Sequence, residues 1–132
     1  TEKIFFAFNK ANILPKSDPL LDNVATVLKK FPQVKKISIE GHTDDVGDDK
    51  TNLTLSEKRA QAVMDAMTKR GVEKGRLAFK GFGKSRPLAP GKDDASRELN
   101  RRVEFIVVDM DPIVEEIIQA IDAPAPLEPV EP

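Results

Sequence analysis

The segment from Val34 to Ala60, VKKISIEGHTDDVGDDKTNLTLSEKRA, decides the fold because its pattern changes twice along its length. Residues 34–41 alternate in side-chain character, with Lys35, Ile37 and Ile39 expected on one face, which is the period of a β-strand. Residues 41–51 are polar and contain two glycines and four aspartates, which predicts a loop. The segment therefore predicts a strand that passes through a polar loop into a helix.

The helix after this loop is expected to begin near Thr54, because Thr54-x-x-Glu57 has the form of a capping box. An apolar stripe then continues at helical spacing, and Gly71 is a typical residue just beyond a helix end. The stripe consists of Ala60, Val63, Met64 and Met67.

The flanking sequence supplies further elements of both kinds. Strands are predicted at residues 3–8, 76–82 and 103–107, and a short turn or helix at 96–100. Asp18-Pro19 predicts the cap and first residue of another helix, which Pro32 ends. The expected order is β-α-β-α-β-β: an α/β fold of two layers (α+β in arrangement), with a mixed sheet and the helices packed on one of its faces.

The expected domain spans residues 1–110, and the remaining sequence has a different character. Asp111-Pro112 predicts an additional helix over 111–122, with an apolar stripe of Ile113, Ile117, Ile118 and Ile121. Residues 123–132 are rich in proline and predict an extended tail. Because the sequence starts at Thr1 rather than at a methionine, we expect a piece of a longer protein.

Composition narrows the classes of function. The 21 basic and 22 acidic side chains give a net charge of -1, and tyrosine and tryptophan are absent, which disfavours nucleic-acid binding. With no cysteine and one histidine, few residues could serve as a nucleophile or hold a metal ion. We expect no catalytic residues, no metal and no cofactor.

A carboxylate and a guanidinium are expected to meet at the carboxyl end of the central strand. Asp44 follows that strand, and Arg59 lies on the first turns of the next helix. An aspartate can accept from an ammonium and an arginine fork can hold a carboxylate, so the pair suits the free head of an amino acid. Asp44 could instead close an Asx turn, and Arg59 could be solvated.

Two other polar features have alternative interpretations. Asp45, Asp48 and Asp49 resemble a cation loop but lack EF-hand spacing, so calcium is the weaker hypothesis. His42 is more typical of a structural hydrogen-bonding residue than of a catalyst. Arg101 and Arg102 alternate at a strand start, so one could face the crevice and the other solvent or a helix.

Several separated motifs resemble the OmpA-like C-terminal peptidoglycan-binding domain family over residues 4–108. The motifs are Phe6-x-Phe-Asn9 with Leu14, Gly41-His-Thr-Asp44, Asn52, Leu55-Ser-x-x-Arg59-Ala60, Gly81-Phe-Gly with Pro87, and Asn100-Arg-Arg-Val-Glu-Phe105. The sequence departs from the family at Ala7, where members often carry Asp or Asn. The resemblance implies a non-enzymatic module in the Gram-negative periplasm, attached through a parent protein to the outer membrane or cell envelope.

The same resemblance implies that the partner is peptidoglycan and that the ligand is the diaminopimelate of its stem peptide. Asp44 is expected to accept from the ligand ammonium, Arg59 to hold its carboxylate, and Arg101 to add a cationic contact. The remaining expected contacts are hydrogen bonds from Asn9, Thr43 and Asn52 and an apolar wall of Leu55 and Phe8. A protein-interaction module that uses the 111–132 segment is the alternative function, and a wall hydrolase is the enzymatic one.

Overall fold

A four-stranded mixed sheet forms one layer of the domain in the computed structural model, which describes residues 3–110. The strands are β1 (Lys3–Phe5), β2 (Val34–Gly41), β3 (Leu77–Gly81) and β4 (Arg102–Met110), in the spatial order β1-β4-β2-β3. β2 is parallel to β3 and antiparallel to β4, and β4 is antiparallel to β1. The predicted mixed sheet is confirmed.

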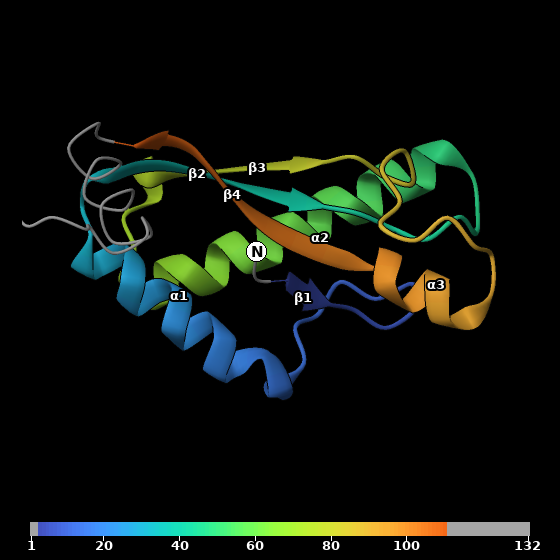
Figure 1. The fold of residues 1–132 in the computed structure, drawn as a ribbon, viewed down its shortest axis with the longest axis horizontal. Coiled ribbons are helices and arrows are strands. Elements are labelled where there is room, and N and C mark those ends of the chain that lie inside the picture. The colour runs from blue at the N-terminus through green and yellow to red at the C-terminus, as the bar shows by residue number, and fades with distance from the viewer. Residues whose placement is uncertain (1–2, 111–132) are drawn as a thin grey trace, which may run out of the picture.

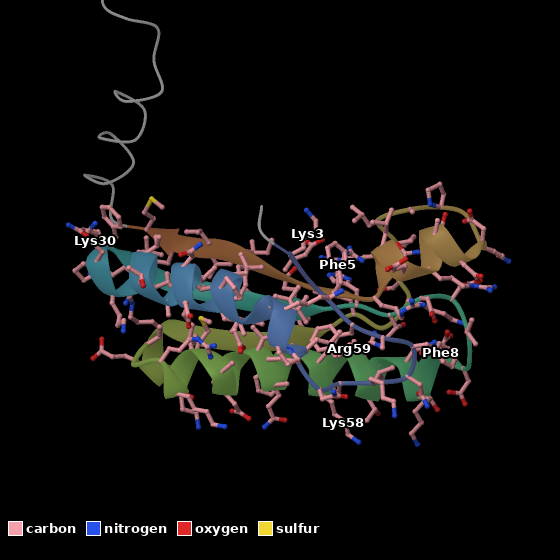
Figure 2. The ribbon with its side chains drawn as sticks, turned by 90° about the horizontal axis from the view of Figure 1, so that it is seen from below. Lys3, Phe5, Phe8, Lys30, Lys58 and Arg59 are labelled. Atoms are coloured by element: carbon pink, nitrogen blue, oxygen red, sulfur yellow. The ribbon has the colours of Figure 1, made fainter. Side chains whose placement is uncertain are left out.

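Two long helices, α1 (Asp18–Lys30) and α2 (Asp49–Lys69), lie on the same side of this sheet (Figures 1 and 2). Buried apolar residues from both helices join those of the strands in one core. The helical members are Leu21, Ala25, Leu28, Ala60, Val63, Met64 and Met67. The predicted α2 stripe is thus buried as expected, whereas Val27 of α1 is exposed.

Three shorter helices complete the described chain. They are the 3-10 turns η1 (Pro15–Ser17) and η2 (Lys74–Arg76) and the α-helix α3 (Asp94–Asn100). α3 lies at the end of the molecule where the loops after β1 and β2 also lie (Figure 1). Asp93 caps α3 by accepting from the Ser96 N–H.

The predicted start of α2 was wrong. The helix begins at Asp49, where Asp48 accepts a hydrogen bond from the Thr51 N–H at 2.8 Å. Thr54 therefore lies inside the helix, and its resemblance to a capping residue is coincidental. An aspartate with a free N–H three residues later is an equally good cap, so the aspartate-rich stretch contained the true signal.

Other boundaries differ by small amounts. Asp18 is the first residue of α1 and Ser17 precedes it as the cap residue, so that cap was placed one residue late. β1 is limited to three residues because the chain leaves the sheet after Phe5. A register shift between Val34 and Ile37 lets both of these residues be buried, although simple alternation would put Val34 on the opposite face.

The predicted helix over 111–122 and the tail over 123–132 lie outside the described residues. Within residues 3–110, no helix combines the length and the apolar character needed to cross a bilayer.

Candidate functional site

Two glycines bring α2 close to the strand ends that support the site. Gly41 of β2 and Gly81 of β3 are paired in the parallel register, and both face Ser56 of α2. A Cβ added to Gly41 would overlap the carbonyl oxygen of Ser56, and one added to Gly81 would overlap the Ser56 hydroxyl. This close approach places Arg59, one turn further along α2, next to the end of β2.

Arg59 is fully buried, at 0% exposure, and its guanidinium joins three separate chain segments. Its Nε donates to the Lys10 carbonyl at 2.8 Å, Nη1 to the His42 carbonyl at 3.0 Å, and Nη2 to the Ala7 carbonyl at 3.0 Å. A guanidinium has five N–H groups, so two remain for another acceptor. Arg59 therefore holds the fold together and is also a candidate ligand contact, and the alternative of a solvated arginine does not apply.

The Arg59 side chain points inward between α2 and the segment after β1, whereas the adjacent Lys58 projects outward (Figure 2). The ring of Phe6 lies 5.2 Å from the guanidinium carbon, which adds a cation–π contact. Burial lowers the pKa of Arg59 to about 10, Asp44 opposes this shift, and Arg101 adds to it. The side chain therefore stays charged at neutral pH.

Asp44 is 3% exposed, and both of its carboxylate oxygens already accept hydrogen bonds. Oδ1 accepts from the Val46 N–H at 3.1 Å, which is the Asx turn considered from the sequence. Oδ2 accepts from Arg101 Nη1, also at 3.1 Å. A carboxylate has about four acceptor positions, so the turn and a ligand contact are compatible.

Arg101 and Arg102 have different environments, which resolves the alternatives left open by the sequence. Arg101 faces the site, pairs with Asp44 and donates to the Phe6 carbonyl at 3.0 Å. Arg102 is buried on the other side of the strand, where it pairs with Glu104 at 2.6 Å and reaches the Arg86 carbonyl. Arg102 is thus shielded from solvent.

A small cavity of about 140 Å³ brings most of the predicted site residues together. The predicted residues in its lining are Phe8, Asn9, Thr43, Asp44, Asn52, Leu55 and Arg59. Arg101 lines an adjoining cavity of about 440 Å³, which also contains Phe8 and Asp44. Val46, Gly47 and Thr51 also line the small cavity, and sequence reasoning did not select them.

The polar residues of this cavity are held by backbone contacts. The Asn52 amide donates to the Val46 carbonyl at 2.9 Å, and the Thr43 hydroxyl donates to the Asp44 carbonyl at 3.0 Å. Asn9 adopts a positive φ of 58°, which turns the chain over the cavity and leaves Phe8 54% exposed at its rim. The cavity therefore combines a charged interior with an exposed aromatic edge.

The aspartates of the loop do not converge on a common point. Asp45 pairs with Arg97 at 2.8 Å, Asp48 caps α2, and Asp49 pairs with Lys84 at 3.3 Å. The hydrogen bond from Arg97 lowers the pKa of the Asp45 carboxyl. Across residues 3–110, no cluster of histidine, aspartate and glutamate has the geometry to hold a metal ion.

His42 is buried at 2% exposure, and its ring stacks on Phe82 with centroids 5.5 Å apart. Among the residues described, neither ring nitrogen has a hydrogen-bond partner, contrary to the expected hydrogen-bonding role. Burial, followed by the charge of Arg102, lowers the pKa of His42 to about 4. His42 is therefore neutral under ordinary conditions and acts as a packing residue.

A buried carboxylate and a buried guanidinium thus line one small cavity, on a scaffold in which the strands β1, β2, β3 and β4 are separated by α1, α2 and α3. The OmpA family model matches residues 5–101, and the chain belongs to this family of OmpA-like peptidoglycan-binding domains. The family is structural and non-enzymatic, so the prediction that the chain is not an enzyme is confirmed.

Individual relatives agree with this assignment. The chain is 42% identical to outer membrane porin F of Pseudomonas aeruginosa, over 75% of this chain and 28% of the porin. It is 37% identical to the peptidoglycan-associated lipoprotein of Legionella pneumophila, over 76% of this chain and 57% of the lipoprotein. The chain thus corresponds to only part of each of these relatives.

Solved structures give the same result for the fold. The peptidoglycan-associated lipoprotein from Burkholderia pseudomallei superposes with a TM-score of 0.77 and 35% identity, covering 80% of this chain and 89% of that one. The C-terminal domain of Helicobacter pylori MotB superposes with a TM-score of 0.78 and 26% identity, covering 92% of this chain and 95% of that one.

Proposed function

We propose that the chain binds peptidoglycan non-covalently through the diaminopimelate residue of the stem peptide. In this role it anchors the outer membrane or an envelope complex to the cell wall, and it acts in the periplasm through a parent protein. Membership of the OmpA family supports wall binding, as do relatives named peptidoglycan-associated lipoproteins. The choice of diaminopimelate depends on the chemistry of the cavity.

The observation that supports this ligand is the pairing of opposite charges across one small cavity. The side chain of diaminopimelate ends in one carbon that bears both an ammonium and a carboxylate. Asp44 offers an acceptor to the ammonium, and the two unused N–H groups of Arg59 offer donors to the carboxylate. Leu55 and Phe8 would enclose the aliphatic part of the side chain.

The charge balance of the site also favours a ligand that carries a carboxylate. Asp44 contributes one negative charge, whereas Arg59 and Arg101 each contribute a positive one, so the interior has an excess of positive charge. A lysine side chain in the same position of a stem peptide would bring an ammonium without the carboxylate. We therefore expect the cavity to prefer diaminopimelate to lysine.

The test compares insoluble sacculi that contain diaminopimelate with sacculi that contain lysine at the same stem position, using the wild type and Asp44→Asn. The substitution keeps an oxygen for the Val46 N–H but removes the negative charge. Losing a buried charge contact of this kind costs on the order of 2–5 kcal/mol, so binding to diaminopimelate sacculi should fall by at least roughly 30-fold.

A matched control is Asp49→Asn, which removes an exposed aspartate charge from the same stretch of chain outside the cavity. It should bind like the wild type. Equal binding of the wild type to both kinds of sacculi would contradict the diaminopimelate assignment, and unchanged binding by Asp44→Asn would contradict the proposed role of the cavity.

A further inference from the structure

A second, larger hollow adjoins the proposed diaminopimelate cavity on the outer side of α2. It has a volume of about 480 Å³ and shares Asn9, Thr51 and Leu55 with the smaller cavity. Its other lining residues are Ala11, Lys50, Thr54 and Lys58. Because the two hollows share walls, a peptide whose side chain fills the small cavity would extend its neighbouring groups into the large one.

The two lysines of this hollow differ from three arginine and lysine side chains near the site that are paired. Within residues 3–110, the side chains of Lys50 and Lys58 make no ion pair or hydrogen bond. By contrast, Lys84 pairs with Asp49, Arg97 with Asp45, and Arg101 with Asp44. The lining of the larger hollow therefore carries two unpaired positive charges and no acidic side chain.

Helical spacing directs the two lysines to the same side. Lys50, Thr54 and Lys58 are four residues apart on α2, so they are successive neighbours along one face of the helix. Lys58 projects outward, away from the buried Arg59 (Figure 2), and it lines the hollow together with Lys50. The face thus presents two cations with a hydroxyl between them.

The cavity on the other side of Asp44, next to α3, has a different charge pattern. The cavity beyond Asp44 is lined by Asp94 and Glu98 of α3, and its cations Arg97 and Arg101 are already paired. A ligand carboxylate would meet free positive charge on the Lys50 side and acidic side chains on the α3 side. This asymmetry favours one direction for an anionic peptide.

We propose that Lys50 and Lys58 form a second subsite, which binds a carboxylate of the stem peptide next to its diaminopimelate. This proposal rests on the proposed function, since the small cavity fixes the peptide in place. Two neighbours could supply the carboxylate: the γ-linked D-glutamate before diaminopimelate has a free α-carboxylate, and a D-alanine after it has a terminal one. The subsite recognises a carboxylate group, which both neighbours carry.

The experiment titrates the full chain with the soluble tetrapeptide L-Ala-γ-D-Glu-meso-diaminopimelate-D-Ala and with three amides of it. One amide blocks the glutamate α-carboxylate, one blocks the terminal carboxylate, and one blocks both. The variants are Lys50→Gln with Lys58→Gln, the control Lys30→Gln with Lys35→Gln, and Asp44→Asn. Lys30 and Lys35 are exposed, and Lys30 lies at the opposite end of the molecule from Phe8 (Figure 2).

Exposed ion pairs are individually weak, so the Lys50 and Lys58 double variant should bind the unmodified tetrapeptide on the order of fivefold less tightly than the control double variant. The difference should shrink as salt is added, because exposed charges are screened. It should vanish with the amide that blocks the recognised carboxylate, and that amide identifies the source.

The two proposals fail in different ways. The lysine subsite is overturned, and the diaminopimelate site survives, if Asp44→Asn loses binding but the two double variants bind equally. The same conclusion follows if the difference between the double variants persists with the doubly blocked peptide. If the wild type does not bind the tetrapeptide, or Asp44→Asn binds it as well as the wild type does, the diaminopimelate site is overturned and the subsite with it.

Discussion

Arg59 shows how one residue can serve both the fold and the site. Its three hydrogen bonds hold the segment after β1 and the end of β2 around the cavity. A ligand carboxylate would use only the N–H groups that these bonds leave free. Loss of binding after a substitution at Arg59 is therefore not sufficient to assign it a ligand role.

We predict that Arg59→Ala lowers the free energy of unfolding by about 3 kcal/mol, because it leaves the buried His42 carbonyl and the partly buried carbonyls of Ala7 and Lys10 without their donor. Urea denaturation checks the prediction. A variant as stable as the wild type would show that these hydrogen bonds contribute little.

His42 predicts a specific dependence of stability on pH. Its pKa in the folded protein is about 4 against an ordinary value of 6.5, so between these values the unfolded chain binds a proton that the folded chain does not. The contribution of neutral His42 to the free energy of unfolding is therefore fully present above pH 6.5 and is lost as the pH falls towards 4. The slope approaches about 1.4 kcal/mol per pH unit.

The measurement is urea denaturation between pH 7 and about 5, above the range where carboxylates titrate. His42→Phe should abolish the slope in this window, since a phenylalanine ring can keep the stacking on Phe82 and does not titrate. A wild type whose stability is constant over the same window would contradict the shifted pKa.

At the scale of elements, the position of α2 determines the position of the site. Gly41 and Gly81 fix the position of α2, because they let the helix approach the strand ends closely. Gly41→Ala should destabilise the domain by about 3 kcal/mol, because the new methyl group meets the Ser56 backbone rather than a movable side chain. It should also weaken peptidoglycan binding, since Arg59 and Leu55 move with the helix.

Gly75→Ala is the matched control for this prediction. Nothing lies within 4 Å of an added Cβ there, so the variant should be as stable as the wild type or more stable by about 0.4–1 kcal/mol. Thermal unfolding and sacculus binding of both variants provide the readout. Equal stability of the two would show that α2 can shift without cost.

The elements themselves were largely predictable, because periodicity reports which face of a strand or helix is buried. The stripe of Ala60, Val63 and Met67 identified α2 correctly, but its first turn was missed. That turn is polar and has no apolar period, so only the choice of cap could locate it. The error concealed Lys50 and Thr51, which line the cavities beside the predicted residues.

Side-chain partners were less predictable than positions. The sequence placed Asp44 and Arg59 at one crevice, and both do line one cavity. It could not reveal that Arg101 pairs with Asp44, or that Arg59 binds carbonyls contributed by Ala7 and Lys10. Such contacts depend on how distant segments cross, which local patterns do not encode.

At the scale of the whole molecule, the site is contained within the family-matched region. All the residues that line the small cavity lie between Phe8 and Arg59, and the core is formed by residues up to Val103. We therefore predict that removing residues 111–132 leaves the affinity for diaminopimelate sacculi within about twofold of that of the full chain.

This truncation also tests the alternative function as a protein-interaction module. If wall binding survives and association with envelope proteins disappears, the removed segment carries a separate activity. If wall binding itself is lost while the truncated chain remains folded, as judged by circular dichroism, the domain boundary at residue 110 was drawn in the wrong place.

The brief pairing of β1 with β4 has a mechanical consequence. Within residues 3–110, β1 contributes just Lys3, Ile4 and Phe5 to the register with β4, and the chain that follows them forms a wall of the cavity. Tension applied through β1 would load these few ladder bonds first and then the carbonyls of Phe6, Ala7 and Lys10 that Arg101 and Arg59 hold. The force at which this segment peels away therefore sets the load that the anchored domain can bear before it releases the wall.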